Sequence, residues 1–328
     1  MSESALSFLF RGPEGARPAL VDRSRSALNH AVDGLFCGSV ATTVYAALRV
    51  GLASIFLVRH ADWLRPWVFL EHHRFVRGLM FLESGAAAEP ALVSPMTPGF
   101  SLSDTATRWL VYARTLLAVF LLLGVRARAA ALGLALVSYA LLAADRFRYY
   151  HHLHLLYVSI AFLALAPIGA SFSVERIAAR LLRRVRGLPD VSATVSSAPS
   201  PAWPLQLVRA LVIGVYAAAF ASKLDPSFLR GDVLRGLERF HVLKGWFWEL
   251  VRDVVGYRGV ATLAGITEIA LPLLLLLRPT RRLAVLLALG FHAGISACMP
   301  VYSFGAQMAV LLVAFLPRRT VAPLERTS

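Results

Sequence analysis

Long apolar segments separated by shorter polar ones dominate the pattern of this chain. Eight of them are each about 17–20 residues long, enough to cross a hydrocarbon core of about 30 Å at 1.5 Å per residue. The segments are residues 41–58, 108–124, 127–144, 152–170, 204–222, 259–277, 282–298 and 301–317. The pattern therefore predicts an all-α, polytopic membrane protein built as a bundle of about eight transmembrane helices.

Composition and segment spacing indicate the domain organisation. The 328-residue chain is 57% hydrophobic and 16% charged, and its mean hydropathy is +0.63. We expect a cytoplasmic N-terminal segment over residues 1–40, a transmembrane domain over 41–318 and a cytoplasmic tail over 319–328. The connection after the fourth segment starts as a basic amphipathic stretch suited to a membrane surface. Its Ser-, Pro- and Ala-rich part, at about 187–202, is predicted to be a flexible linker.

The formal net charge of +15 comes mainly from arginines that lie between the apolar segments. This distribution favours positive-inside topology and contact with anionic lipid, and it argues against nucleic-acid binding. The largest group follows the fourth segment, which we therefore expect to end in the cytoplasm: Arg176, Arg180, Arg183, Arg184 and Arg186. The connections after the third, fifth and seventh segments then face outside. The Ala-, Arg- and Leu-rich, Lys-poor composition suggests a bacterial inner membrane, with any site at the outer ends of these helices facing the periplasm.

Ionisable side chains also fall within or at the ends of the apolar segments, where a charge is costly and a functional role is the default expectation. They are Arg49, Arg114, Arg209, Lys223, Glu268 and His292. A purely structural role is the alternative for the arginines and Glu268. In that case Arg114 or Arg209 would pair with Glu268 across the bundle, and Arg49 would extend toward the interface.

The stretch "YYHHLHLLY" at 149–157 places polar rings at the start of the fourth segment. Tyr149 and His152 share a helical face with Leu156, at spacings of three and four residues, so we expect a histidine to point into the bundle. The alternative is a haem or metal ligand in an electron-transfer protein. No second carboxylate or histidine pair stands at ligand spacing, so no metal is expected.

Four stretches together resemble one known family. They are "YARTLLAVFLLLGVRAR" at 112–128, "YYHHLHLLYVSIAFLALAPIGASFSVERI" from residue 149, "LVRALVIGVYAAAFASKLDPSFLRG" from residue 207, and "GFHAGISACMPVYSFGAQMAVLLVAFLP" from residue 290. In order and spacing they are similar to the transmembrane part of the vitamin K-dependent gamma-glutamyl carboxylase family, the horizontally transferred transmembrane (HTTM) domain. The resemblance covers about residues 40–318.

The resemblance implies roles for individual residues. Lys223 falls on the family's catalytic base, and His152 and His292 fall on its functionally important histidines. Residues that keep other motif positions are expected to support or bind the quinone: Tyr149, Arg209, Tyr216, Asp225, Glu268 and Ser303. The sequence departs from the family pattern at His151, Phe228 and Glu175. We also expect no counterpart of the large lumenal domain that follows the membrane part of the animal enzymes.

The implied activity is that of a carboxylase and epoxidase, a carbon–carbon lyase and monooxygenase. A reduced vitamin K, such as menaquinol or a related quinol, would react with O₂ and become an epoxide. Proton abstraction and addition of CO₂ to an unknown peptide or small-molecule substrate would be coupled to this oxidation. The expected partners are thus membrane lipid, a lipid-soluble quinol and that substrate.

Lys223 is unusual in its own right, because only Lys223 and Lys244 among the 34 basic residues are lysines. A buried lysine can become neutral and act as a base, whereas arginine stays protonated. The alternative is a lysine that extends to the interface. The sequence therefore predicts that Lys223, His152 and His292 meet near the outer leaflet, and a non-catalytic HTTM scaffold or quinone- or lipid-binding protein remains the alternative to an enzyme.

Overall fold

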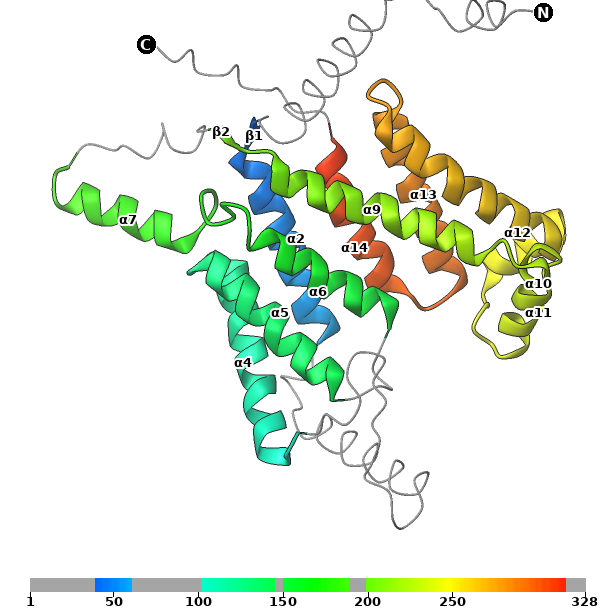
Figure 1. Cartoon of the computed structure of the whole chain (residues 1–328), viewed down its shortest axis with the longest axis horizontal. Helices are drawn as coiled ribbons and strands as arrows, with labels where there is room; N and C mark the ends of the chain where they lie inside the picture. Colours follow the sequence, from blue (N-terminus) through cyan, green and yellow to red (C-terminus); the bar gives the residue numbers. More distant parts are fainter. Residues whose placement is uncertain (1–38, 61–101, 145–149, 189–198, 317–328) are drawn as a thin grey trace, which may run out of the picture.

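The computed structural model describes residues 39–60, 102–144, 150–188 and 199–316, and most of these residues are helical (Figure 1). Its longer helices are α2 (Thr42–Arg59), α4 (Asp104–Leu123), α5 (Ala127–Ala143), α6 (His151–Leu163), α7 (Val174–Val185), α9 (Trp203–Ser222), α12 (Trp246–Leu276), α13 (Arg281–Cys298) and α14 (Tyr302–Leu312). Its short elements are β1 (Ser39–Ala41), β2 (Pro199–Pro201), α10 (Pro226–Leu229), α11 (Asp232–Arg239) and η3 (Val313–Phe315).

Each predicted apolar segment contains a helix, so the all-α prediction is confirmed for the described residues. Five helices are long and apolar enough to cross a membrane: α2, α4, α9, α12 and α13. Three shorter apolar helices, α5, α6 and α14 with η3, complete the set. Large apolar side chains such as Leu263, Ile266 and Leu286 are exposed on the long helices, as expected where lipid is the solvent.

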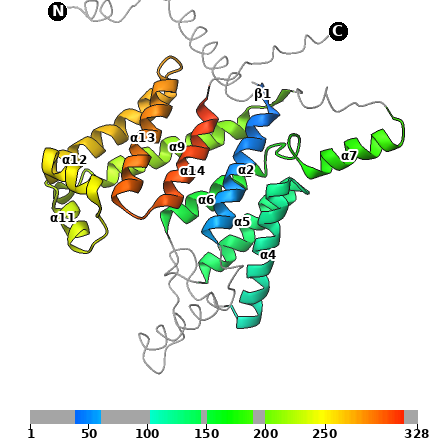
Figure 2. The same cartoon turned by 180° about the vertical axis from the view of Figure 1, so that it is seen from behind.

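Helix α2 is the centre of the bundle. It lies between α4 and α14 in the view from behind (Figure 2), and it packs against both of them and against α6. Tyr45, Leu48, Leu52 and Phe56 are buried on it at spacings of three and four residues, which places them along one side of the helix. On the other side of the bundle α12 and α13 pack together, with α9 against α12 and α14 against α13.

Arg49 lies at the centre of α2 and is fully buried. Its Nη1 donates to the carbonyl of Ile168 at 3.2 Å and its Nη2 to that of Phe172 at 2.6 Å. Gly124, which ends α4 in the left-handed conformation (φ 75°), comes so close that a Cβ there would overlap Nη1. The Arg49 guanidinium thus holds the backbone that follows α6 and is buried by protein there, instead of being exposed to lipid headgroups.

Two helices depart from the predicted bounds for identifiable reasons. α6 ends at Leu163 instead of continuing to residue 170, because Pro167 cannot extend a helix and the backbone turns there. α12 begins at Trp246, well before residue 259, and Gly256 breaks its helical conformation with φ 73° and ψ 164°. The segment before this kink is only partly apolar, so the apolar pattern alone did not include it.

The predicted linker is not wholly irregular. Its described residues Pro199–Pro201 form β2, which pairs antiparallel with β1 and aligns Val40 with Ser200. The hydroxyl of Tyr45 donates to the carbonyl of Pro201 at 2.5 Å and joins this small ribbon to α2. Backbone pairing between segments so far apart in sequence leaves no local pattern, which is why the sequence did not predict it.

Candidate functional site

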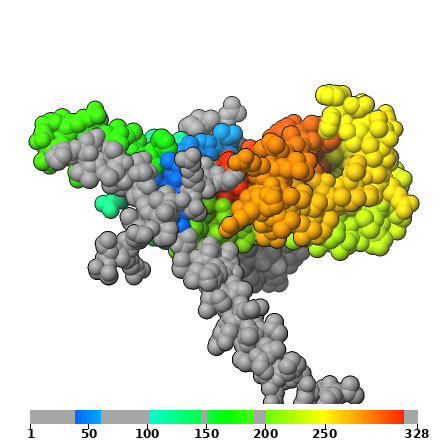
Figure 3. Space-filling model, turned by 90° about the horizontal axis from the view of Figure 1, so that it is seen from above, coloured from blue at the N-terminus to red at the C-terminus, as the bar shows by residue number. Residues whose placement is uncertain are grey.

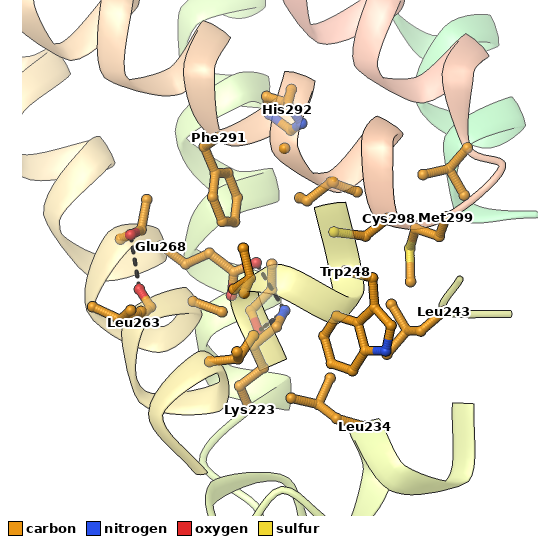
Figure 4. Close-up of a pocket in the computed structure, with 18 of the residues that line it drawn as sticks. Lys223, Leu234, Leu243, Trp248, Leu263, Glu268, Phe291, His292, Cys298 and Met299 are labelled. Carbon is orange, nitrogen blue, oxygen red and sulfur yellow. Dashed lines mark hydrogen bonds and ion pairs between the residues drawn. The ribbon is translucent and has the colours of Figure 1, made fainter. Parts of the chain in front are cut away.

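A cavity of about 550 Å³ lies between α9, α12 and α13, and residues of α10 and α11 line one end of it (Figure 4). Most of its lining is apolar, with Trp248, Phe291 and Phe304 among the larger side chains. Polar or charged groups enter it at Tyr216, Lys223, Thr267, Glu268 and His292. Because Tyr216 and Lys223 are seven residues apart, they share a face of α9, about two helical turns from each other.

Lys223 and Glu268 form an ion pair at one level of this cavity. Lys223 ends α9, and its Nζ donates to Glu268 Oε1 at 2.8 Å (Figure 4). The same ammonium lies 5.4 Å from the centre of the Phe228 ring and contacts the carbonyl of Ala219 at 3.4 Å. The Glu268 side chain is only 6% exposed, against 21% for Lys223. The pair is therefore asymmetric, with the carboxylate more deeply buried than the ammonium.

Tyr216 and His292 form a second polar pair deeper along α9. The Tyr216 hydroxyl and His292 Nε2 are 2.9 Å apart, and both side chains are buried. The imidazole packs edge-to-face on Phe304 and beside Phe291. His292 Nδ1 and Glu268 Oε2 are buried without a hydrogen-bond partner among the described residues. Both side chains line the cavity, so its mostly apolar wall contains two buried polar atoms without a hydrogen-bond partner among the described residues.

The structure also corrects the predicted partner of Glu268. Neither arginine proposed for it reaches this carboxylate. Arg209 Nε donates to the carbonyl of Ala314 at 2.8 Å and its Nη1 to Gln206, and the Arg114 guanidinium lies 6.0 Å from the Phe56 ring centre. Arg209 stands about four turns before Lys223 on α9, so it lies toward the other end of the bundle and outside the cavity lining.

His152 does not line this cavity. Its ring stacks on Tyr150, with ring centres 5.4 Å apart, at the start of α6. The Gln307 amide, oriented to suit its neighbours, donates to the His152 carbonyl at 3.0 Å, so the start of α6 lies against α14. The expectation that His152 meets Lys223 and His292 in one site is thus not met, while Lys223 and His292 do line the same cavity. Tyr149 lies outside the described residues.

Two further predicted residues lie outside the cavity lining. Asp225 is exposed and caps α10, where its carboxylate accepts the backbone N–H of Ser227 at 2.7 Å. Hydrogen bonds from Ser227 hold the Asp225 pKa below its usual range. Ser303 is partly buried in the first turn of α14, beside the lining residues Val301 and Phe304. Asp225 therefore serves local structure, and Ser303 lies beside the cavity without lining it.

Sequence reasoning missed Glu238, whose hydrogen bonds hold part of the cavity wall. Glu238 of α11 accepts hydrogen bonds from Trp248 Nε1 at 2.9 Å, from Arg252 at 2.5 Å and from the Tyr257 hydroxyl. These bonds, the one from Tyr257 first, hold the Glu238 pKa below its usual range. The Trp248 ring, held in this way, is buried and forms part of the cavity wall. The aromatic stretch "WFWEL" from residue 246 was the available signal.

The side chains that could ligate a metal were compared for whether they gather in one place. In the part of the chain that the structure describes, no three His, Cys, Asp or Glu side chains gather as a metal site would require. His151, His152 and His154 lie close together in sequence on α6, and the Tyr139 hydroxyl lies 3.1 Å from His154 Nδ1.

Comparison with known proteins gives a family match. The HTTM domain matches residues 100–318, more than half of the chain, and this range includes Lys223, Glu268 and His292. No curated protein and no solved structure matches the chain.

Proposed function

Because the chain belongs to the HTTM-domain family, we propose that it is an integral membrane enzyme related to vitamin K-dependent carboxylases. It oxidises a reduced quinone with O₂ in the cavity between α9, α12 and α13. The quinol and O₂ give the quinone epoxide and water. Proton removal from a C–H bond of a second substrate, and addition of CO₂ to that carbon, are coupled to this oxidation.

The observation that carries the proposal is the pair of buried, unpartnered atoms in an apolar cavity. Burying a polar atom without a partner costs about 1–3 kcal/mol, so a ligand that supplies hydrogen bonds is favoured there. Glu268 Oε2 can accept from a hydroxyl, and His292 Nδ1 can accept from or donate to a second oxygen. A ring that bears two oxygens on an otherwise apolar body meets both requirements.

The cavity also suits a substrate that arrives from lipid. Leu263 lines the cavity and is 53% exposed, so the lining includes an exposed apolar side chain on α12, a helix long and apolar enough to cross a membrane. Gly290 of α13 lines the same region, and a Cβ built there meets nothing within 4 Å. A quinol with an isoprenoid tail can therefore place its ring inside while its tail remains among apolar groups.

The Lys223–Glu268 pair is the proposed proton acceptor. In the ion pair Lys223 donates to Oε1, and Oε2 has no partner among the described residues. If the shared proton moves to Glu268, the neutral Lys223 amine can take the quinol proton. The result is a protonated lysine beside a protonated carboxyl, with the negative charge on the substrate oxygen. In this scheme the lysine acts as the base only together with Glu268, because the carboxylate must first take the shared proton.

Turnover by the purified chain in nanodiscs tests the proposal. With menaquinol or reduced phylloquinone, wild type should consume O₂ and form the epoxide, detected by mass spectrometry. Lys223→Ala should lose about 10²–10⁴ in rate, the usual contribution of a positioned acid–base group. Lys223→Arg should be nearly as inactive, because arginine cannot release the proton. The matched control is Lys244→Ala, since Lys244 is exposed and lies outside the cavity lining.

Binding can be measured separately from turnover. Cys298 lines the cavity, so a bound quinone should slow its reaction with a maleimide in a Cys37→Ser background. Protection of Cys298 without any O₂ consumption would contradict the enzyme and favour a quinone- or lipid-binding protein. If the quinone does not protect Cys298 and no O₂ is consumed, the result contradicts both the enzyme and the quinone-binding protein. An active Lys223→Arg enzyme with an inactive Glu268→Gln enzyme would move the proton acceptor from the lysine to the carboxylate.

The proposed orientation places the Lys223 end of the cavity, which α10 and α11 line, toward the periplasmic face of a bacterial inner membrane. It rests on the arginine-rich connection between α6 and α9, which the positive-inside rule places in the cytoplasm. Lys223 and the α13–α14 turn lie at the opposite ends of their helices from the basic connections. Co-substrates from the periplasm would then reach the site past α10 and α11.

A further inference from the structure

Helix α7, Val174–Val185, is amphipathic and projects from the bundle that the other described helices form. None of its residues is buried. In Figures 1 and 2 it extends away from α2 and α6, and from above (Figure 3) its green surface reaches the edge of the molecule. Its apolar residues recur at spacings of three and four and form one face: Val174, Ile177, Ala178, Leu181, Leu182 and Val185.

That apolar face is extensively exposed. Ile177 and Leu181 are each 56% exposed and Val185 is 85% exposed. The neighbouring Phe172, just before the helix, is 75% exposed. A soluble surface rarely presents a contiguous apolar strip of this kind, so the face is expected to lie against another apolar phase.

The N-terminal end of α7, its root, is held by hydrogen bonds to the bundle, and these bonds set where the helix starts. The backbone N–H of Arg126, in the turn between α4 and α5, donates to Glu175 Oε1 at 2.9 Å. Ser173 caps the helix by accepting the N–H of Arg176, and Arg49 holds the carbonyl of Phe172. Because α4 and α5 are apolar helices that meet at this turn, α7 starts at the level of the membrane surface.

The opposite face of α7 is basic. Arg183, Arg184 and Arg186 are exposed, and Glu175 at the other end is engaged by Arg126. Guanidinium groups suit phosphate because they can donate two parallel hydrogen bonds. The 12 residues of the helix extend only about 18 Å, too short to cross a core of about 30 Å. The helix therefore has the length, the charge and the apolar face of one that lies in an interface.

We propose that α7 lies in the headgroup region of the protein's own membrane, with Leu181 and its neighbours among the acyl chains and the arginines on anionic phospholipid headgroups. This arrangement extends the footprint of the bundle beyond its transmembrane helices. It does not depend on the proposed enzymatic function. A soluble partner protein is the rival occupant, but the fixed root at the turn between α4 and α5 favours the bilayer.

Spin labels on the full-length chain test this proposal. In a Cys37→Ser, Cys298→Ser background, Leu181→Cys reports the apolar face and Ala179→Cys reports the opposite, exposed face. In liposomes that contain phosphatidylglycerol, the label at 181 should be accessible to O₂ and shielded from a water-soluble nickel chelate. The label at 179 should show the reverse. Equal exposure of both labels to the nickel chelate would overturn the proposal.

Lipid charge provides the second arm of the test. Each basic residue near an anionic surface contributes about fivefold to association, so Arg183→Gln, Arg184→Gln and Arg186→Gln together should lower the equilibrium constant for immersion on the order of a hundredfold. Phosphatidylcholine alone should weaken immersion similarly. Unchanged thermal unfolding of the triple variant controls for folding, since these residues are exposed. The proposal would be contradicted if immersion of the label at 181 changed neither with lipid charge nor in the triple variant. It would also be contradicted if that label were shielded from the nickel chelate only after a cell extract was added.

Discussion

Removing the ammonium of the Lys223–Glu268 pair should destabilise the protein more than removing the carboxylate charge. Lys223→Met keeps the length of the side chain but leaves Glu268, 6% exposed, with no partner for either oxygen among the described residues. Removing one partner of a buried ion pair costs about 3–5 kcal/mol. We expect the free energy of unfolding to fall by about that amount, less whatever Glu268 recovers by taking up a proton.

Glu268→Gln should be milder. The amide oxygen can still accept from Lys223, and the ammonium keeps its contacts with the Ala219 carbonyl and the Phe228 ring and its 21% exposure. A hydrogen bond to a charged group is worth about 1.5–3 kcal/mol, and only part of it is lost here. Adding Glu268→Gln to Lys223→Met should restore stability, because it removes the orphaned charge. The expected coupling free energy is about 1–3 kcal/mol.

The assay is reversible unfolding in mixed micelles of wild type, the two single variants and the double variant. Lys244→Met is the matched control and should lie within about 0.5 kcal/mol of wild type, as exposed substitutions usually do. The reasoning would be refuted if the two single effects simply added, or if Glu268→Gln cost more than Lys223→Met. Either result would mean that the buried Glu268 carboxylate does not depend on the Lys223 ammonium for its stability.

Two further predictions concern the backbone and pH. Gly124→Ala should lower the free energy of unfolding by at least about 1–2 kcal/mol, because the left-handed φ disfavours a side chain and the new Cβ would meet Arg49. Gly214→Ala is the control: a Cβ there meets nothing within 4 Å, so this change should stabilise α9 by about 0.5–1 kcal/mol, as measured by thermal unfolding. Since the Glu238 pKa is held below its usual value of about 4.3, the stability that Glu238 gives to α11 and to the Trp248 wall is present above that pH and is lost as the pH falls through the lowered value. Hydrogen exchange of residues 232–239, corrected for the intrinsic rate, should show this loss in wild type, whereas Glu238→Gln should be less protected at neutral pH and show no such step. If the protection of residues 232–239 in wild type did not change at low pH, the proposed role of the Glu238 carboxylate would be contradicted.

The cavity residues show how far local sequence can reach. Lys223 and His292 were singled out from sequence because each is an ionisable group at an apolar segment, and the structure places both in one cavity. Glu268 was found by the same signal, but two arginines were expected as its partners, whereas the structure pairs it with Lys223. Glu238 and Trp248 gave only a weak signal, since a surface carboxylate and a tryptophan before a span are ordinary features.

The sequence by itself determined the apolar helices, because the cost of placing a segment in a bilayer depends mainly on that segment's own residues. It also determined the family and the unusual lysine, since both are properties of residue identity and order. Only the tertiary structure decided that Lys223 meets Glu268, that Tyr216 meets His292 and that His152 lies elsewhere. Such partners come from different helices, so they depend on the rotation of each helix about its axis and on how the helices cross. Those angles are set by the packing of side chains over the whole bundle, which no local spacing contains.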